Sequence, residues 1–219
     1  MYAWLVVEPQ HAELLPAAAA RAWSAGGGEV AEVELPVRKG TRPLVFTWID
    51  RQGATAQRPP RWPDLLVEWA DIYSESLFPG EDALAVLAEE ISAMGADALL
   101  LHVAPGLAGC TVAWYERGAL SLYEHVGGGT VSWTEADGLG RPSEGRGRTM
   151  ALAGARKLAG AVGRDSDHSI LDRIEHSARA TSAVLIERAL HRFLAADPPP
   201  FDELAGLVAR ARVQPLAPR

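Results

Sequence analysis

Thiols are almost absent from this chain, since Cys110 is its only cysteine. No intramolecular disulfide can form, which is typical of proteins from a reducing compartment. Long apolar runs are also missing, and none approaches the roughly 18 residues that a membrane-spanning helix needs. The opening MYAWLVVEPQ has no basic region and is typical of a first strand, not of a signal peptide. We therefore expect a cytoplasmic protein without a transmembrane segment.

Catalytic signatures are missing as well. The chain has no Gly-x-Ser-x-Gly elbow, which excludes the commonest hydrolase pattern. Cys110 lies at the start of the predicted strand 109–116 and not at a helix N-terminus, so nothing nearby lowers the pKa of its thiol, and a buried, inert cysteine is expected. The sequence predicts no catalytic residue, no cofactor and no metal site, and it favours a protein that is not an enzyme.

Basic residues are nearly absent from the middle of the chain. Residues 62–140 carry thirteen Asp or Glu against one base, Arg117, which gives a net charge of −12. Residues 1–61 count +1 and residues 141–219 count +4, and the three parts add up to the formal −7. A one-sided field of this kind steers association and selects partners. The negative total also disfavours direct contact with nucleic acid.

Composition otherwise indicates an ordinary globular protein. The 219 residues are 48% hydrophobic and 22% charged, which allows a real core and disfavours disorder for the bulk of the chain. Of the 21 basic residues only Lys39 and Lys157 are lysines. In a chain rich in alanine and glycine, that bias indicates a bacterial genome of high GC content.

Strand patterns dominate the first two thirds of the chain. Apolar or alternating stretches predict strands at 2–7, 29–37, 43–50 and 98–103, and further strands at 109–116, 119–126 and 130–134 are separated by glycine turns. Helices are expected at 11–24, where Pro16 should begin or kink the main part, at 64–76 and at 81–94. The prolines of 54–63 predict an extended connector.

The last third is predicted to be helical. Helices are expected at 149–162, 167–196 and 201–212, followed by a frayed tail. Together these patterns predict an α+β fold: an antiparallel or mixed sheet with helices packed on one face, plus a helical C-terminal part. We expect an α+β body over 1–140, with a β-meander at 97–134, and a loop and helical segment over 141–219 that packs on this body.

The main candidate site lies in the acidic residues 62–140. Asp64, Glu68, Asp71 and Glu75 recur at helical spacing and form a carboxylate stripe on one helix face. Trp69 and Tyr73 lie among them as candidate anchors. The full set of expected partner-binding residues is Asp64, Glu68, Trp69, Asp71, Tyr73, Glu75, Glu89 and Glu90. The alternative is a solvated face, or one that pairs with the chain's own C-terminal arginines.

A glycine- and arginine-rich stretch gives a second candidate. The sequence GLGRPSEGRGRT at 138–149 directly precedes a predicted helix, and glycine amides, arginines and a helix N-terminus together can hold a phosphate. The expected anion-binding residues are Arg141, Arg146, Arg148 and Thr149. The stretch lacks the lysine of a P-loop, so a surface loop is the alternative.

Two further patterns are weaker. His168, Asp172 and His176 share one face of the predicted helix 167–196, but they have no companion ligand motif, so we interpret them as a solvated face. The later half of that helix has a wide apolar arc. This arc either packs inside the chain or forms a homo-oligomer interface.

These observations predict a non-enzymatic bacterial interaction protein, such as an adaptor, an inhibitor of the immunity type or a complex subunit, that docks a basic protein through its acidic face. The alternative is an enzyme or sensor that binds a phosphorylated small molecule at 138–149.

Overall fold

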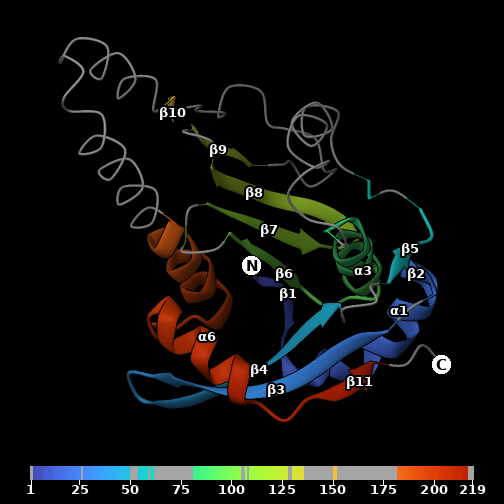
Figure 1. Cartoon of the computed structure of the whole chain (residues 1–219), viewed down its shortest axis with the longest axis horizontal. Coiled ribbons are helices and arrows are strands. Elements are labelled where there is room, and N and C mark those ends of the chain that lie inside the picture. The colour runs from blue at the N-terminus through green and yellow to red at the C-terminus, as the bar shows by residue number, and fades with distance from the viewer. Residues whose placement is uncertain are drawn as a thin grey trace, which may run out of the picture.

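The computed structural model consists of one large sheet with helices on both of its faces (Figure 1). The residues that the structure describes are 2–25, 27–49, 54–58, 60–61, 81–104, 107, 109–127, 130–135, 150–151 and 182–216.

The described strands of the main sheet follow the order β10-β9-β8-β7-β6-β1-β4-β3-β11, and every neighbouring pair is antiparallel. Their bounds are β1 Tyr2–Val7, β3 Gly28–Val37, β4 Gly40–Ile49, β6 Ala98–Val103, β7 Cys110–Glu116, β8 Ala119–Gly127, β9 Thr130–Glu135, β10 Met150–Ala151 and β11 Gln214–Leu216. A second, two-stranded sheet joins β2 (Trp23–Ala25) to β5 (Thr55–Ala56).

Strands β6 to β9 form the meander that the sequence predicts for 97–134. The turn between β7 and β8 uses Arg117 and Gly118, at φ +53° and +77°. Positive φ at both central residues matches the right-handed twist of the flanking strands, which explains a glycine here. The meander is thus built from local pairings, which glycine turns in the sequence mark.

The N-terminal strand β1 lies at the centre of the sheet, between β6 and β4. Its side chains alternate between two hydrophobic clusters: Leu5 and Val7 face one, and Trp4 and Val6 face the other. Because all six residues of β6 are buried too, the middle of the sheet needs a helical layer on each side.

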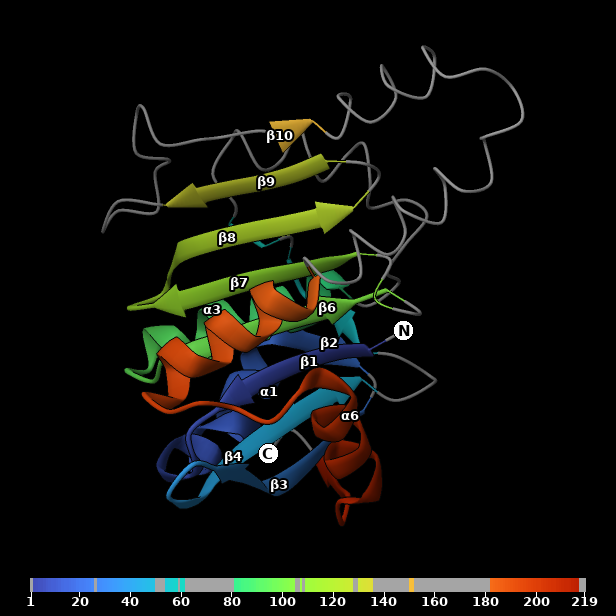
Figure 2. The ribbon, with the colours of Figure 1, turned by 90° about the vertical axis from the view of Figure 1, so that its left-hand side faces the viewer.

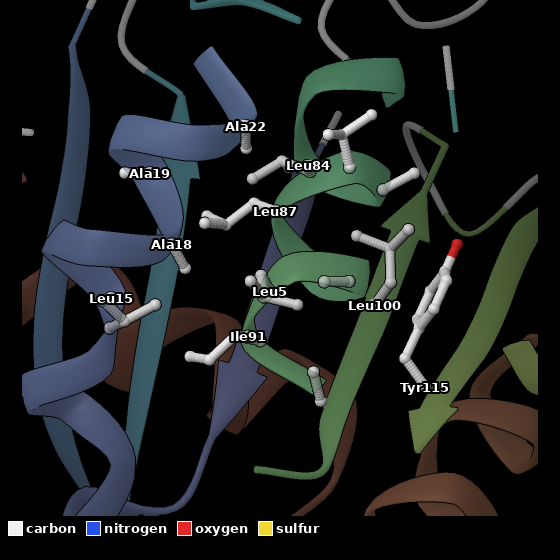
Figure 3. Close-up of a cluster of buried hydrophobic side chains, with 14 of the residues drawn as sticks. Leu5, Leu15, Ala18, Ala19, Ala22, Leu84, Leu87, Ile91, Leu100 and Tyr115 are labelled. Carbon is white, nitrogen blue, oxygen red and sulfur yellow. The ribbon is translucent and has the colours of Figure 1, made fainter. Parts of the chain in front are cut away.

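The first layer consists of α1 (Leu15–Ala22) and α3 (Glu81–Ala93). Buried residues of α1 recur at helical spacing and meet those of α3 above the sheet, as Figure 3 shows. The labelled members of this cluster are Leu5, Leu15, Ala18, Ala19, Ala22, Leu84, Leu87, Ile91, Leu100 and Tyr115. The small alanines of α1 let the two helices approach closely.

The second layer comes from the C-terminal part of the chain (Figure 2). Helical residues 182–194 bury Leu185, Ile186 and Leu190 against the sheet, and α6 (Phe201–Arg210) buries Phe201 and Leu204 beside them. The predicted α+β class with an antiparallel sheet is confirmed. The sequence placed the body's helices on one face, and the structure adds that the C-terminal helices cover the opposite face.

Near the N-terminus the predicted helix 11–24 is shorter than expected. Pro9–Leu14 forms a 3-10 helix, η1, and α1 follows with Pro16 in its first turn. A proline fits there because the first amide groups of a helix have no partner within it. The helix ends before Trp23, which enters β2 and donates its indole N–H to the carbonyl of Ala83 at 3.0 Å.

Two short strands correct the expectations for the C-terminal third. Met150 and Ala151, predicted to begin a helix, pair with β9 as β10. The tail predicted to fray forms β11, which pairs with the first three residues of β3 and buries Leu216. In both cases an open sheet edge provides hydrogen bonds that local sequence patterns do not reveal. The predicted helix 64–76 and residues 152–181 lie outside the described residues.

Candidate functional site

An arginine clamp holds the two acidic residues of α3 that the sequence assigns to partner binding. Arg58, in the proline-rich connector, donates to Glu89 at 2.8 Å and to Glu90 at 2.7 Å. The backbone N–H of Arg61 donates to the second oxygen of Glu89. The connector is also tied to α1, since the Gln57 N–H donates to the carbonyl of Ala22 at 2.8 Å.

Burial decides the electrostatics of this clamp. Glu89 is only 3% exposed, and Arg58 is 29% exposed. Burial raises the pKa of Glu89, and the hydrogen bonds from Arg58 and Arg61 offset that rise only in part. The same two carboxylates raise the pKa of Arg58. The two shifts have opposite meanings for the ion pair: the contact favours the charged form of Arg58, whereas burial disfavours the charged form of Glu89.

The clamp changes the role of Glu89 and Glu90. Glu89 faces the connector of its own chain, and half-buried Glu90 shares the same arginine. We therefore interpret this pair as structural and not as an outward docking face. The other expected partner-binding residues lie outside the described residues: Asp64, Glu68, Trp69, Asp71, Tyr73 and Glu75.

A third carboxylate of the acidic segment, residues 62–140, also forms an ion pair within the chain. Glu124 of β8 accepts from Arg188, in the helical residues 182–194. The sequence left open whether C-terminal arginines neutralise the acidic segment, and Arg188 is one that does. The expected anion-binding residues Arg141, Arg146, Arg148 and Thr149 lie outside the described part of the chain, as do His168, Asp172 and His176.

Two residues of the nucleophile and base type, Cys110 and His102, are buried. The Cys110 thiol donates to the carbonyl of Ser182 at 3.7 Å, and burial raises its pKa to about 12. His102 is fully buried in β6, and desolvation lowers its pKa to about 3. The predicted burial of Cys110 is confirmed. A thiol that stays protonated and an imidazole that stays neutral away from solvent are poorly suited to catalysis.

The apolar arc of the predicted helix 167–196 packs within the chain where it is described. Trp114 of β7 meets Phe193 edge-on, with ring centroids 5.1 Å apart, and Arg192 lies 5.3 Å from the Trp114 ring centre. Leu185, Ile186 and Leu190 are buried in the same cluster. Among the described residues, this surface is therefore occupied by the sheet of the same chain.

A half-open groove of about 430 Å³ lies at the β3 end of the sheet, and no sequence pattern predicts it. It runs between η1 and α1 on one side and the C-terminal strand on the other. The residues that line it are Ala12, Leu15, Pro16, Val30, Ala31, Glu32, Val45, Arg212, Gln214, Pro215 and Leu216. Among these lining residues Leu15, Val45 and Leu216 are apolar and buried.

The exposed carboxylate of Glu32 in β3 lines this groove, and exposed Glu34 follows two residues later on the same face of the strand. Within the described residues neither has an ion pair, and the same holds for Arg212. The alternation of Glu32 and Glu34 with Val33 and Leu35 is visible in the sequence. That this strand borders a groove is not, because its neighbours come from distant segments.

Among the helices that the structure describes, none has the length and apolarity needed to cross a membrane. Nor do the described residues contain a group of three or more His, Cys, Asp or Glu side chains placed to hold a metal ion. Comparison of the chain with protein-family models, curated proteins and solved structures found no match.

Proposed function

We propose that this chain is a non-enzymatic interaction protein of the bacterial cytoplasm that docks a basic protein partner through its acidic segment, residues 62–140. One observation carries the proposal. The segment has a net charge of −12, and among the described residues its carboxylates form ion pairs with two arginines from outside it, Arg58 and Arg188. A field of that size attracts a basic surface and speeds encounter with it.

The side chains of the described residues favour a binding role over a catalytic one. Cys110 and His102 are buried, and Glu89 is committed to the arginine clamp. By contrast, Asp97 is exposed and Glu116 is half-buried at one end of the sheet, and neither has an ion pair within the described residues. The segment thus retains carboxylates that a partner can reach.

The test is a pull-down with the tagged full chain from its host, at low and at high salt, read by mass spectrometry. We expect a stoichiometric basic protein that is lost at high salt, because ionic strength screens exposed charges. Asp71→Lys/Glu75→Lys should then weaken binding about tenfold or more, since it reverses the field where the partner docks.

A matched control changes the net charge equally on other elements. Glu8→Lys/Glu203→Lys replaces two exposed carboxylates outside the acidic segment. It should leave affinity within about twofold, because it changes no residue of the segment that is proposed to contact the partner and exposed charges without a direct contact are screened by salt. Equal weakening by both double variants would point to net charge alone. That result, or a partner whose binding ignores Asp71→Lys/Glu75→Lys, contradicts the proposal.

A further inference from the structure

Within the described part of the chain, the outer edge of β3 is unpaired over most of its length. β11 pairs only with Gly28, Glu29 and Val30, whereas β3 continues to Val37. From Ala31 onward, no described strand pairs with this side of β3. An open edge presents backbone N–H and C=O groups that can pair with another extended chain. Pro36 fits this position, since proline within sheets is confined to edges, strand starts and bulges.

Side chains on the two faces of this edge differ in character. Glu32 and Glu34 are exposed on the face that carries α1, beside the groove. Ala31, Val33 and Leu35 are buried on the face that carries α6. A strand added here would place alternate side chains next to carboxylates and next to apolar residues.

The groove extends the acidic face of the edge. Its lining includes the apolar, buried residues Leu15, Val45 and Leu216 and the exposed carboxylate of Glu32. A long cationic side chain suits this shape, because its aliphatic stem can lie on apolar surface while its charge reaches a carboxylate. Arg212 lines the same groove and is the one cation among its lining residues.

We propose that the open edge of β3 and the adjoining groove bind an extended basic segment of a protein partner, in which Lys or Arg alternates with apolar residues. The segment adds to the sheet as a further antiparallel or parallel strand, with its cations on Glu32 and Glu34 and its apolar side chains beside Val33 and Leu35. Main-chain hydrogen bonds hold it, and the two carboxylates select its charge.

Charge also discriminates against the most obvious competitor, a second copy of the chain. An antiparallel β3–β3 pair centred on Val33 would bring Glu32 of one copy opposite Glu34 of the other. Like charges that face each other across strands are destabilising. Carboxylates on an edge thus block self-pairing while they admit a basic strand.

This site lies on β3, η1, α1 and β11 and contains no residue of the segment 62–140, so it goes beyond the function proposed above. The two proposals are tested by different substitutions. A host protein that loses affinity on Asp71→Lys/Glu75→Lys but not on Glu32→Lys/Glu34→Lys would leave the proposed function standing without the edge site. The reverse pattern would leave only the edge site.

The probe is a random-sequence peptide display library, selected on the tagged full chain. We expect enriched peptides in which Lys or Arg alternates with apolar residues. For one such peptide made synthetically, Glu32→Lys/Glu34→Lys should weaken binding at least tenfold, whereas Glu8→Lys/Glu203→Lys should leave it within twofold. Arg212→Ala should strengthen binding, because it removes a cation from the groove. Methylation of alternate peptide nitrogens should abolish binding, because it removes N–H donors of the added strand.

Several results would overturn the inference. In the library selection, these results are the enrichment of no peptide or of peptides without basic residues. With the synthetic peptide, they are an affinity that Glu32→Lys/Glu34→Lys leaves unchanged, weaker binding to Arg212→Ala, and equal binding of the N-methylated peptide. Light scattering measures the oligomeric state and so tests whether a second copy of the chain binds the β3 edge. A dimer whose formation depends on Glu32 and Glu34 would assign the edge to self-association instead. Circular dichroism of each variant establishes that a loss of binding is not a loss of fold.

Discussion

Gly28 shows how a single residue can be fixed by packing and not by backbone freedom. A Cβ built at this position would lie 2.6 Å from the Trp23 ring and 3.1 Å from the carbonyl oxygen of Trp48. The Trp23 indole is itself held by its hydrogen bond to Ala83. The ring therefore has little room to move, and glycine is the residue that lets β3 begin where β11 and β2 converge.

We predict that Gly28→Ala lowers the free energy of unfolding by about 2 kcal/mol, because an overpacked core must shift side chains or backbone. Urea denaturation followed by tryptophan fluorescence measures it. Gly206→Ala is the matched control: in α6 the new methyl meets only the flexible end of Arg210, at 3.1 Å. Since alanine favours helix over glycine by about 1 kcal/mol, that variant should be neutral or more stable. Equal effects of the two would contradict the packing argument.

Cys110 and His102 illustrate what sequence patterns reveal about single residues. Cys110 lies in a predicted apolar strand and its burial followed from that pattern. His102 is one polar residue at the end of an apolar strand, and the sequence did not distinguish a buried histidine from an accessible one. Its burial depends on the layers that cover β6, which are contributed by segments far along the chain.

At the scale of elements, the clamp joins a strand connector to a helix. Arg58 lies 31 residues from Glu89 and 32 from Glu90. No local spacing predicts such a contact, so the sequence assigned both glutamates to a docking face. In the structure, Arg58 pairs with both Glu89 and Glu90, and the backbone N–H of Arg61 donates to Glu89.

We predict that Arg58→Ala lowers the free energy of unfolding by about 2 kcal/mol, because it leaves Glu89 buried without its main partner. Exposure of Arg58 keeps the cost at the lower end of the range for buried pairs. The double variant Arg58→Ala/Glu89→Gln should recover part of the loss, since a neutral amide is cheaper to bury than a carboxylate. Urea denaturation of the two single variants and the double variant gives the coupling. Additive effects would show that the clamp contributes nothing.

The length of a strand or helix decides whether the sequence predicts it. The described helix α3 and strands β3, β4 and β6 to β9 agree with their predicted spans to within three residues at each end, because each is long enough to show its period. β10 and β11 span two and three residues, which is too short for any period. They exist because β9 and β3 offer an edge to pair with.

At the scale of the whole molecule, the C-terminal part crosses from one face of the sheet to the other. α6 packs on one face, and β11 then follows the edge of β3 and buries Leu216 in the cluster below α1. The two hydrophobic clusters are thus connected by one short strand. This path also forms one wall of the groove.

We predict that deletion of residues 213–219 lowers the free energy of unfolding by about 3 kcal/mol, through the loss of Leu216 and of the pairing with β3. It should also promote self-association, because it exposes the edge of Gly28–Val30. Urea denaturation and light scattering measure the two effects. Leu216→Ala retains the strand. This variant should therefore have a lower free energy of unfolding than the parent chain but show no more self-association than it. Unchanged stability of the deletion variant would contradict this role of β11.

The sequence by itself determined the fold class, the meander and its turns, the apolar central strands and the uneven distribution of charge. Each of these follows from composition or from a period of a few residues, which is local information. Only the tertiary structure decided which face the C-terminal helices cover, which carboxylates are neutralised inside the chain, and where the sheet keeps an open edge. Those outcomes depend on contacts between distant segments, such as Arg58 with Glu89 and β11 with β3, because burial and pairing are properties of the assembled layers.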